Sequence, residues 1–115
     1  MESGINARAI DFARFGRMML NRGVAGGRQI VPADWVDMST KPNAPELKPD
    51  YGLMWWLDPE RPGRFYAWGN LGQFIYVAPD RDVVVVRSGQ SYGGLDPLQW
   101  RALLRDLADR AAVVP

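Results

Sequence analysis

The side chains that most often carry out catalysis are scarce in this sequence, which contains no His and no Cys. His is the usual general base and a common zinc ligand near neutral pH, while Cys supplies thiolate nucleophiles and disulfides. A self-contained mechanism that depends on His or on a thiol is therefore excluded. We expect no metal site in the chain.

One segment has the spacing of a serine nucleophile motif. Gly89, Ser91 and Gly93 match the pattern G-x-S-x-G, and they lie between an expected strand and an expected helix. The Ser of that motif needs a His to accept its proton, and the chain has none. We therefore interpret the segment as a loop rather than as an active site.

Residues 65–77 combine aromatic side chains with Gly69 and Gly72 at a predicted turn. Gly lets the backbone bend sharply or approach a ligand, and backbone N–H groups at a strand edge can bind an oxyanion. Aromatic residues at this density are typical of a core, but they can also form a stacking platform for sugars or bases. Trp68, which adjoins the turn, is open to either role. The rings that we expect in the core are those of Trp56, Phe65 and Phe74.

Charge and hydropathy exclude two kinds of partner. The 14 basic and 13 acidic residues leave a net charge of +1, and nucleic acids or anionic membranes would need clustered positive charge. The longest apolar stretches, at 74–78 and 83–86, are too short to span a bilayer. We expect a soluble chain with no nucleic-acid and no membrane partner. The cytoplasm and the periplasm both stay open, because any export signal would lie upstream.

The first fifty residues predict helices followed by a loop. Asn6 can cap a helix that runs to about Asn21, and Pro32 suits the first position of a short helix through Met38. Three Pro residues indicate an extended surface loop at 41–50, which we favour over an inter-domain linker. The apolar stripe expected on the first helix contains Ala9, Phe12, Ala13, Gly16, Met19 and Leu20.

The second half of the chain predicts strands and a last helix. The expected strands, rich in aromatic and β-branched residues, are 51–57, 64–68, 73–78 and 82–87. The turn at 79–81 predicts an antiparallel hairpin, and the continuous apolar sequence of its strands indicates that both faces of the sheet are covered. Asp96 and Gln99 predict the start of a helix that covers one face. Its expected apolar side contains Trp100, Leu103, Leu104, Leu107, Ala108 and Ala111.

Five segments, in order and similarly spaced, together resemble a known family. They are SGINA leading into DFARFGRMM, GRQIVPADWV, YGLMWW, FYAWGNLGQFIYV and PDRDVVVV. The resemblance is to the C-terminal part of the serine β-lactamase family, in the branch with class C β-lactamases, β-lactamase-like esterases and 6-aminohexanoate-dimer hydrolases. It implies a partial penicillin-binding-protein-like α+β fold: an antiparallel sheet of three to four strands, a C-terminal helix packed on it and an N-terminal helical segment. Residues 1–115 would form one C-terminal fragment, with the helical region and loop in 1–50 and the sheet and last helix in 51–115.

The resemblance also implies acyl transfer without a cofactor. In the family, the Ser of an S-x-x-K motif attacks an ester, amide or lactam carbonyl, and the Lys and the Tyr of a Y-x-N motif move protons. Neither Lys41 nor Lys48 follows a Ser by three residues, and no Tyr-x-Asn occurs. Both motifs would precede residue 1, so we expect the chain alone to be inactive. Its implied partner is the missing N-terminal part of the same hydrolase domain.

The family's third motif, K-T-G in β-lactamases, falls at Ala67, Trp68 and Gly69. The resemblance implies that the backbone N–H of Asn70 donates to the oxyanion, that Gly69 permits close approach and that Trp68 lines the acyl pocket. Because the Lys and Thr that help to hold an antibiotic carboxylate are absent, we favour an esterase or amidase.

Two other functional classes remain open for this chain. The chain could be a binding module that keeps the third-motif surface without catalysis, or a structural module that forms a homo-oligomer through an exposed sheet edge. An S-x-x-K and a Y-x-N in the upstream reading frame would favour the hydrolase.

Overall fold

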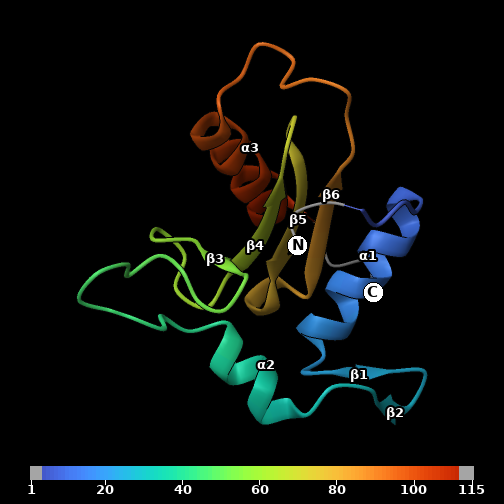
Figure 1. The fold of residues 1–115 in the computed structure, drawn as a ribbon. Helices are drawn as coiled ribbons and strands as arrows, with labels where there is room; N and C mark the ends of the chain where they lie inside the picture. The colour runs from blue at the N-terminus through green and yellow to red at the C-terminus, as the bar shows by residue number, and fades with distance from the viewer. Residues whose placement is uncertain (1–3, 112–115) are drawn as a thin grey trace.

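The computed structural model describes residues 4–111, which form helices and two antiparallel sheets in an α+β fold (Figure 1). Strands β3, β4, β5 and β6 pair in that order, and β1 and β2 form a small hairpin. This arrangement confirms the fold class expected from the sequence. The elements are α1 (Ala9–Leu20), β1 (Val24–Ala25), β2 (Arg28–Gln29), α2 (Ala33–Ser39), β3 (Trp56–Leu57), β4 (Phe65–Gly69), β5 (Gln73–Ala78), the 3-10 helix η1 (Pro79–Arg81), β6 (Val83–Arg87) and α3 (Pro97–Arg110).

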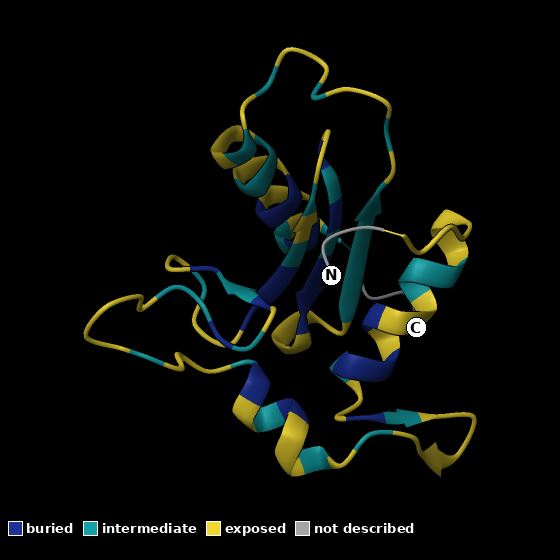
Figure 2. Ribbon diagram, viewed as in Figure 1, coloured by how far each residue is buried: buried dark blue, intermediate teal, exposed yellow. Residues whose placement is uncertain are grey.

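The centre of the larger sheet is β5, which pairs with β4 on one side and β6 on the other. Its side chains alternate between two apolar clusters, so that Tyr76 packs with α3 while Val77 packs with α1. Both residues are fully buried, as Figure 2 shows for this part of the sheet. The continuous apolar sequence of β5 is therefore explained by a helix on each face, as predicted.

Helix α1 lies close against the sheet at Gly16. A Cβ atom there would come within 2.7 Å of Val84 and 2.8 Å of Ile75, so a larger residue would push the helix away. The helix begins at Ala9, and Arg8 rather than Asn6 occupies the cap position. The physical reason is Asp11, whose carboxylate accepts the backbone N–H of Arg8 at 3.2 Å and fixes the first turn there.

The prediction of a strand over 51–57 is wrong except at β3. Tyr51 pairs with Trp56 across a tight bend, in which the N–H of Gly52 donates to the carbonyl of Trp55 at 2.8 Å. Met54 takes a left-handed conformation with φ of 69°. A Cβ on Gly52 would lie 2.1 Å from the carbonyl oxygen of Ser39, so packing against the end of α2 sets the bend.

Smaller shifts affect other predicted boundaries. Strand β4 runs one residue later than expected, β5 is as predicted, and β6 begins after Asp82, whose φ of 55° ends η1. Pro32 takes the cap position of α2 instead of its first helical position. Residues 41–50 form a loop with one isolated bridge between Ala44 and Lys48.

Helix α3 begins as predicted, with Asp96 and Gln99 in a reciprocal capping box. Its buried side is only partly the expected one, because Leu104 is 2% exposed whereas Leu107 is 47% exposed. Arg105 explains the difference, since its guanidinium donates to the buried carboxylate of Asp58 at 2.8 and 2.7 Å. This ion pair turns the side of α3 that contains Arg105 toward Asp58 and the sheet. Leu103 and Leu107 are therefore exposed, contrary to the prediction.

We predict that Leu104→Ala lowers the free energy of unfolding by about 2–5 kcal/mol, because it leaves a cavity between α3 and the sheet. The matched control is Leu107→Ala on the same helix, where the loss should stay below about 1 kcal/mol. Urea denaturation followed by Trp fluorescence measures both. Equal losses would show that α3 does not pack as described.

Candidate functional site

The residues implied by the family's third motif lie at the end of β4 and in the turn that follows it. Trp68 and Gly69 end the strand, and residues 70–72 connect it to β5. The N–H of Gly72 donates to the carbonyl of Gly69 at 3.3 Å and closes the turn. Leu71 and Gly72 have φ of 65° and 82°, and the left-handed conformation costs a non-Gly residue roughly 1–2 kcal/mol.

The outer edge of β4 is free beside this turn. Strand β3 pairs with only Phe65 and Tyr66 of β4. Within residues 4–111, no strand pairs with that edge from residue 67 to 69, and no acceptor binds the N–H of Asn70. Asn70 is an exposed residue. An unused backbone donor at a strand end is one element that oxyanion binding requires.

Trp68 forms a partly exposed aromatic wall next to this donor. Its side chain is 39% exposed and lies parallel to Phe74 at 6.4 Å between ring centroids. Its indole N–H donates to the hydroxyl of Tyr92 at 3.2 Å. Phe74 is buried as predicted, as is Phe65, whereas Trp56 is half-buried and tilted against Trp68 at 5.7 Å.

Ser91 lies in the loop between β6 and α3, as the sequence analysis proposed. Its side chain is exposed, and its hydroxyl oxygen accepts the backbone N–H of Gly93 at 3.2 Å. This local contact is typical of a turn-forming Ser. The loop passes over the end of the sheet where β4 turns into β5 (Figure 1). Nothing in the sequence pattern indicated that it lies against that turn.

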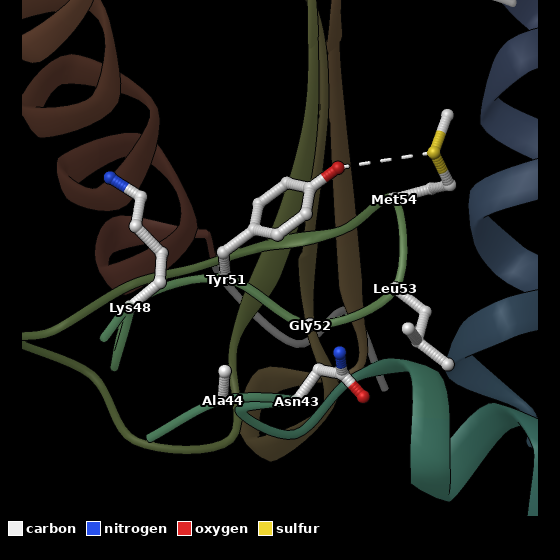
Figure 3. Close-up of a pocket in the computed structure, with 7 residues that line it drawn as sticks. All are labelled: Asn43, Ala44, Lys48, Tyr51, Gly52, Leu53 and Met54. Carbon is white, nitrogen blue, oxygen red and sulfur yellow. Dashed lines mark hydrogen bonds between the residues drawn. The ribbon is translucent and has the colours of Figure 1, made fainter. Parts of the chain in front are cut away.

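A pocket of about 260 Å³ lies beside the bend at residues 51–54 (Figure 3). The hydroxyl of Tyr51 donates to the sulfur of Met54 at 3.9 Å across it. Residues 68–70 line neither this pocket nor the larger one, of about 540 Å³, next to Asp58 and Arg64. Trp68 and Asn70 are both exposed, so the third-motif site lies on the surface of the described residues.

A cluster of charged side chains lies at the start of β4, opposite the turn. The buried carboxylate of Asp58 accepts hydrogen bonds from Arg105 and from the Tyr76 hydroxyl, the latter at 2.5 Å. Burial raises the pKa of Asp58, but hydrogen bonds from Arg105 and Tyr76 outweigh it and hold the pKa below its usual value. Burial, with the hydrogen bond to Asp58, raises the pKa of Tyr76.

The second part of the cluster centres on Arg64, which is 2% exposed. Its guanidinium binds Asp80 at 2.9 Å and Asp109 at 2.7 Å. Arg61 and then Arg64 hold the pKa of Asp109 at about 2. Since these charges are paired with one another and tie α3 to the sheet, we assign the cluster to stability rather than chemistry. No group of acidic side chains in residues 4–111 could hold a metal ion, and none of their helices could cross a membrane.

The pKa values of Asp58, Asp80 and Asp109 are all lowered in the folded protein. They predict that the fold becomes less stable at acid pH. A carboxyl group with a lowered folded-state pKa stabilises the fold above its unfolded pKa of about 3.9, and this contribution is lost as the pH falls through the folded value. The free energy of unfolding should therefore fall between about pH 5 and pH 2.

Asp58→Asn leaves the buried Arg105 with the exposed carboxylate of Glu60 as its partner, so it should cost up to about 3–5 kcal/mol at neutral pH and weaken the acid dependence. Asp106→Asn is the control, because the ion pair that Asp106 forms with Arg110 on the same helix is exposed. Chemical denaturation across the pH range measures both. A wild-type stability that is flat down to pH 3 would refute the assignment.

Comparisons with known proteins point to one group of hydrolases, although no established family profile matches the chain. A 6-aminohexanoate-dimer hydrolase of Paenarthrobacter ureafaciens is 31% identical over 111 residues, which cover 87% of this chain and 28% of that protein. An uncharacterized protein of Alkalihalophilus pseudofirmus is 26% identical over 114 residues, covering 86% of this chain and 34% of its own.

A solved structure from Bacillus anthracis, provisionally assigned as a 6-aminohexanoate-dimer hydrolase, has the same fold. It superposes with a TM-score of 0.76 at 28% identity, covering 91% of this chain and 29% of the other. The chain thus spans about a third or less of the length of these relatives.

Proposed function

Because the chain belongs to the β-lactamase family, in which it corresponds to a C-terminal part similar to 6-aminohexanoate-dimer hydrolases, we propose that it forms one wall of an acyl-transfer site. Residues 1–115 would be a single C-terminal fragment of a serine hydrolase domain that contributes the third-motif strand. The observation that carries the proposal is the free edge of β4, which is followed by the N–H of Asn70, a donor without an acceptor among residues 4–111.

In the proposed reaction a Ser outside this chain attacks an ester or amide carbonyl. The carbonyl oxygen becomes negatively charged as the tetrahedral intermediate forms, and the N–H of Asn70 donates a hydrogen bond to it. The second donor, the nucleophile and the groups that move protons would come from the remaining part of the protein. Without them the chain cannot complete the acyl transfer.

Gly69 is compatible with this assignment, because its backbone conformation does not require a glycine. An added Cβ would first meet the Cβ of Gln73 at 3.3 Å, so a side chain at position 69 would have to displace Gln73 slightly. Because a glycine has no side chain, it leaves room for a substrate to approach the strand closely at this position. The exposed ring of Trp68 would then pack against the apolar part of the acyl group.

We favour an ester or amide substrate over a lactam. Ala67 and Trp68 occupy the places of the Lys and Thr that would help to hold an antibiotic carboxylate. Two of the relatives are also named as a dimer hydrolase and not as a β-lactamase.

The second candidate function is a module that binds or dimerises without catalysis. Strand β6 lies at the edge of the sheet, and its valines are only half-buried. Unpaired edges of this kind tend to pair with another chain.

We predict that the purified 115-residue chain hydrolyses neither p-nitrophenyl acetate nor nitrocefin above the buffer rate, because it lacks the S-x-x-K and Y-x-N motifs. The Ser91→Ala variant of the chain should behave identically in both spectrophotometric assays. Turnover that persists through further purification and disappears in Ser91→Ala would instead identify Ser91 as a nucleophile.

The proposed oxyanion donor can be tested in the full-length hydrolase by removing one N–H. Asn70→Pro deletes that donor and should lower turnover on the order of 10²–10³-fold, whereas Asn70→Ala keeps the N–H and should retain most activity. Circular dichroism checks that the Pro variant folds, since Pro can distort the strand end. A folded Asn70→Pro enzyme with normal turnover would show that another N–H binds the oxyanion.

A further inference from the structure

The β4–β5 turn, residues Asn70–Gly72, is exposed at its tip and contains two left-handed residues in succession. A backbone donor contributes to catalysis only if it is held in one orientation before the substrate arrives. Two long hydrogen bonds close the turn from within the hairpin, one from the N–H of Gly72 to the carbonyl of Gly69 and one from the side-chain amide of Gln73 to the carbonyl of Asn70, each at 3.3 Å. Something outside the turn must therefore hold it.

Arg87, the last residue of β6, makes that contact. Its Nη1 donates to the carbonyl oxygens of both Leu71 and Gly72, each at 2.9 Å. Its guanidinium also lies over the ring of Trp100, 4.3 Å from the centroid. In residues 4–111 no carboxylate forms an ion pair with Arg87, so its donors serve the turn.

Two glycines make room for this guanidinium. An added Cβ on Gly72 or on Gly89 would come within 2.5 Å of Arg87 atoms. Gly72 also needs its positive φ, but Gly89 does not have one. A larger residue at position 89 would therefore displace the guanidinium of Arg87 from its place beside the turn.

Residues 89–93, the segment with the spacing of a nucleophile motif but no His to act as its base, lie against the same turn. We call this segment the strap. The side chain of Gln73 bridges to it, accepting the N–H of Gly89 at 3.0 Å and donating to the carbonyl of Gly89. Tyr92 accepts the indole N–H of Trp68, and its own carbonyl accepts the indole N–H of Trp100 at 2.7 Å. Arg87 and the strap thus hold the turn from two sides.

We propose that Arg87 is a positioning residue: by binding the carbonyls of Leu71 and Gly72 it fixes the orientation of the Asn70 N–H toward the reacting carbonyl. This inference rests on the proposed function, because it assigns Arg87 a role in the same site. Arg87 itself does not touch the substrate, and it acts only through the turn.

The first test needs no catalysis and uses the 115-residue chain. Arg87→Met removes both hydrogen bonds while keeping an unbranched side chain, and ¹⁵N relaxation then measures the order of residues 70–72. The order parameters of these amides should fall in Arg87→Met and stay unchanged in Arg14→Met, a control at an exposed Arg that pairs with Asp11 on α1. Unchanged order in Arg87→Met would overturn the proposal.

The second test measures turnover by the full-length hydrolase. Arg87→Met should lower kcat on the order of 10–100-fold while KM changes by less than about threefold, because a displaced donor weakens mainly the transition state. Arg87→Lys should recover part of kcat, since its ammonium can still donate to the turn carbonyls. A stable, folded Arg87→Met enzyme with normal kcat would refute the positioning role.

The two tests separate failure of this inference from failure of the proposed function. If Asn70→Pro leaves turnover normal, the assignment of the Asn70 N–H as oxyanion donor is wrong, regardless of the result for Arg87. If Asn70→Pro is inactive but Arg87→Met neither loosens the turn nor lowers kcat, the oxyanion assignment stands and the role of Arg87 is overturned.

Discussion

The burial of β5 on both faces is the constraint on which the rest of the structure depends. Tyr76 and Val77 are neighbours in sequence, point to opposite sides and are both fully buried, so each face of the sheet needs its own cover. Helix α1 meets this need at Gly16 and α3 meets it at Leu104. Strand β4, paired along its length with this fixed strand, can then leave the end of its outer edge unpaired. The proposed site lies on that edge, which combines a rigid support with an accessible backbone.

The parts of the fold that the sequence predicts correctly are those fixed by neighbouring residues. The continuous apolar run of β5 and the capping box that opens at Asp96 are local signals, and both are confirmed. The failures depend on contacts between distant residues. The bend at 51–55 is set by packing of Gly52 on the end of α2, and the exposure of Leu107 follows from the Arg105–Asp58 pair. No periodicity in either segment contains that information.

The candidate site was likewise predictable only where its signals are local in sequence. Trp68 and Asn70 were singled out by their place in a family pattern, and their chemical roles stay predictions that the free strand edge supports. Arg87 gave no sequence signal, because its hydrogen bonds to the turn join residues that are 15 and 16 positions apart. A glycine that clears space for a guanidinium, as at position 89, cannot be distinguished from a loop glycine before the structure is known.

We propose a division of the active site in which this chain forms one side and a segment outside it supplies the nucleophilic Ser. Covalent labelling tests this proposal. A fluorophosphonate phosphonylates an activated Ser with loss of fluoride, and intact-mass spectrometry counts the adducts. We predict no adduct on the 115-residue chain. The full-length hydrolase should give a single adduct that peptide mapping places on a Ser outside these residues. An adduct on Ser91, or on any other Ser of this chain, would contradict the proposed division.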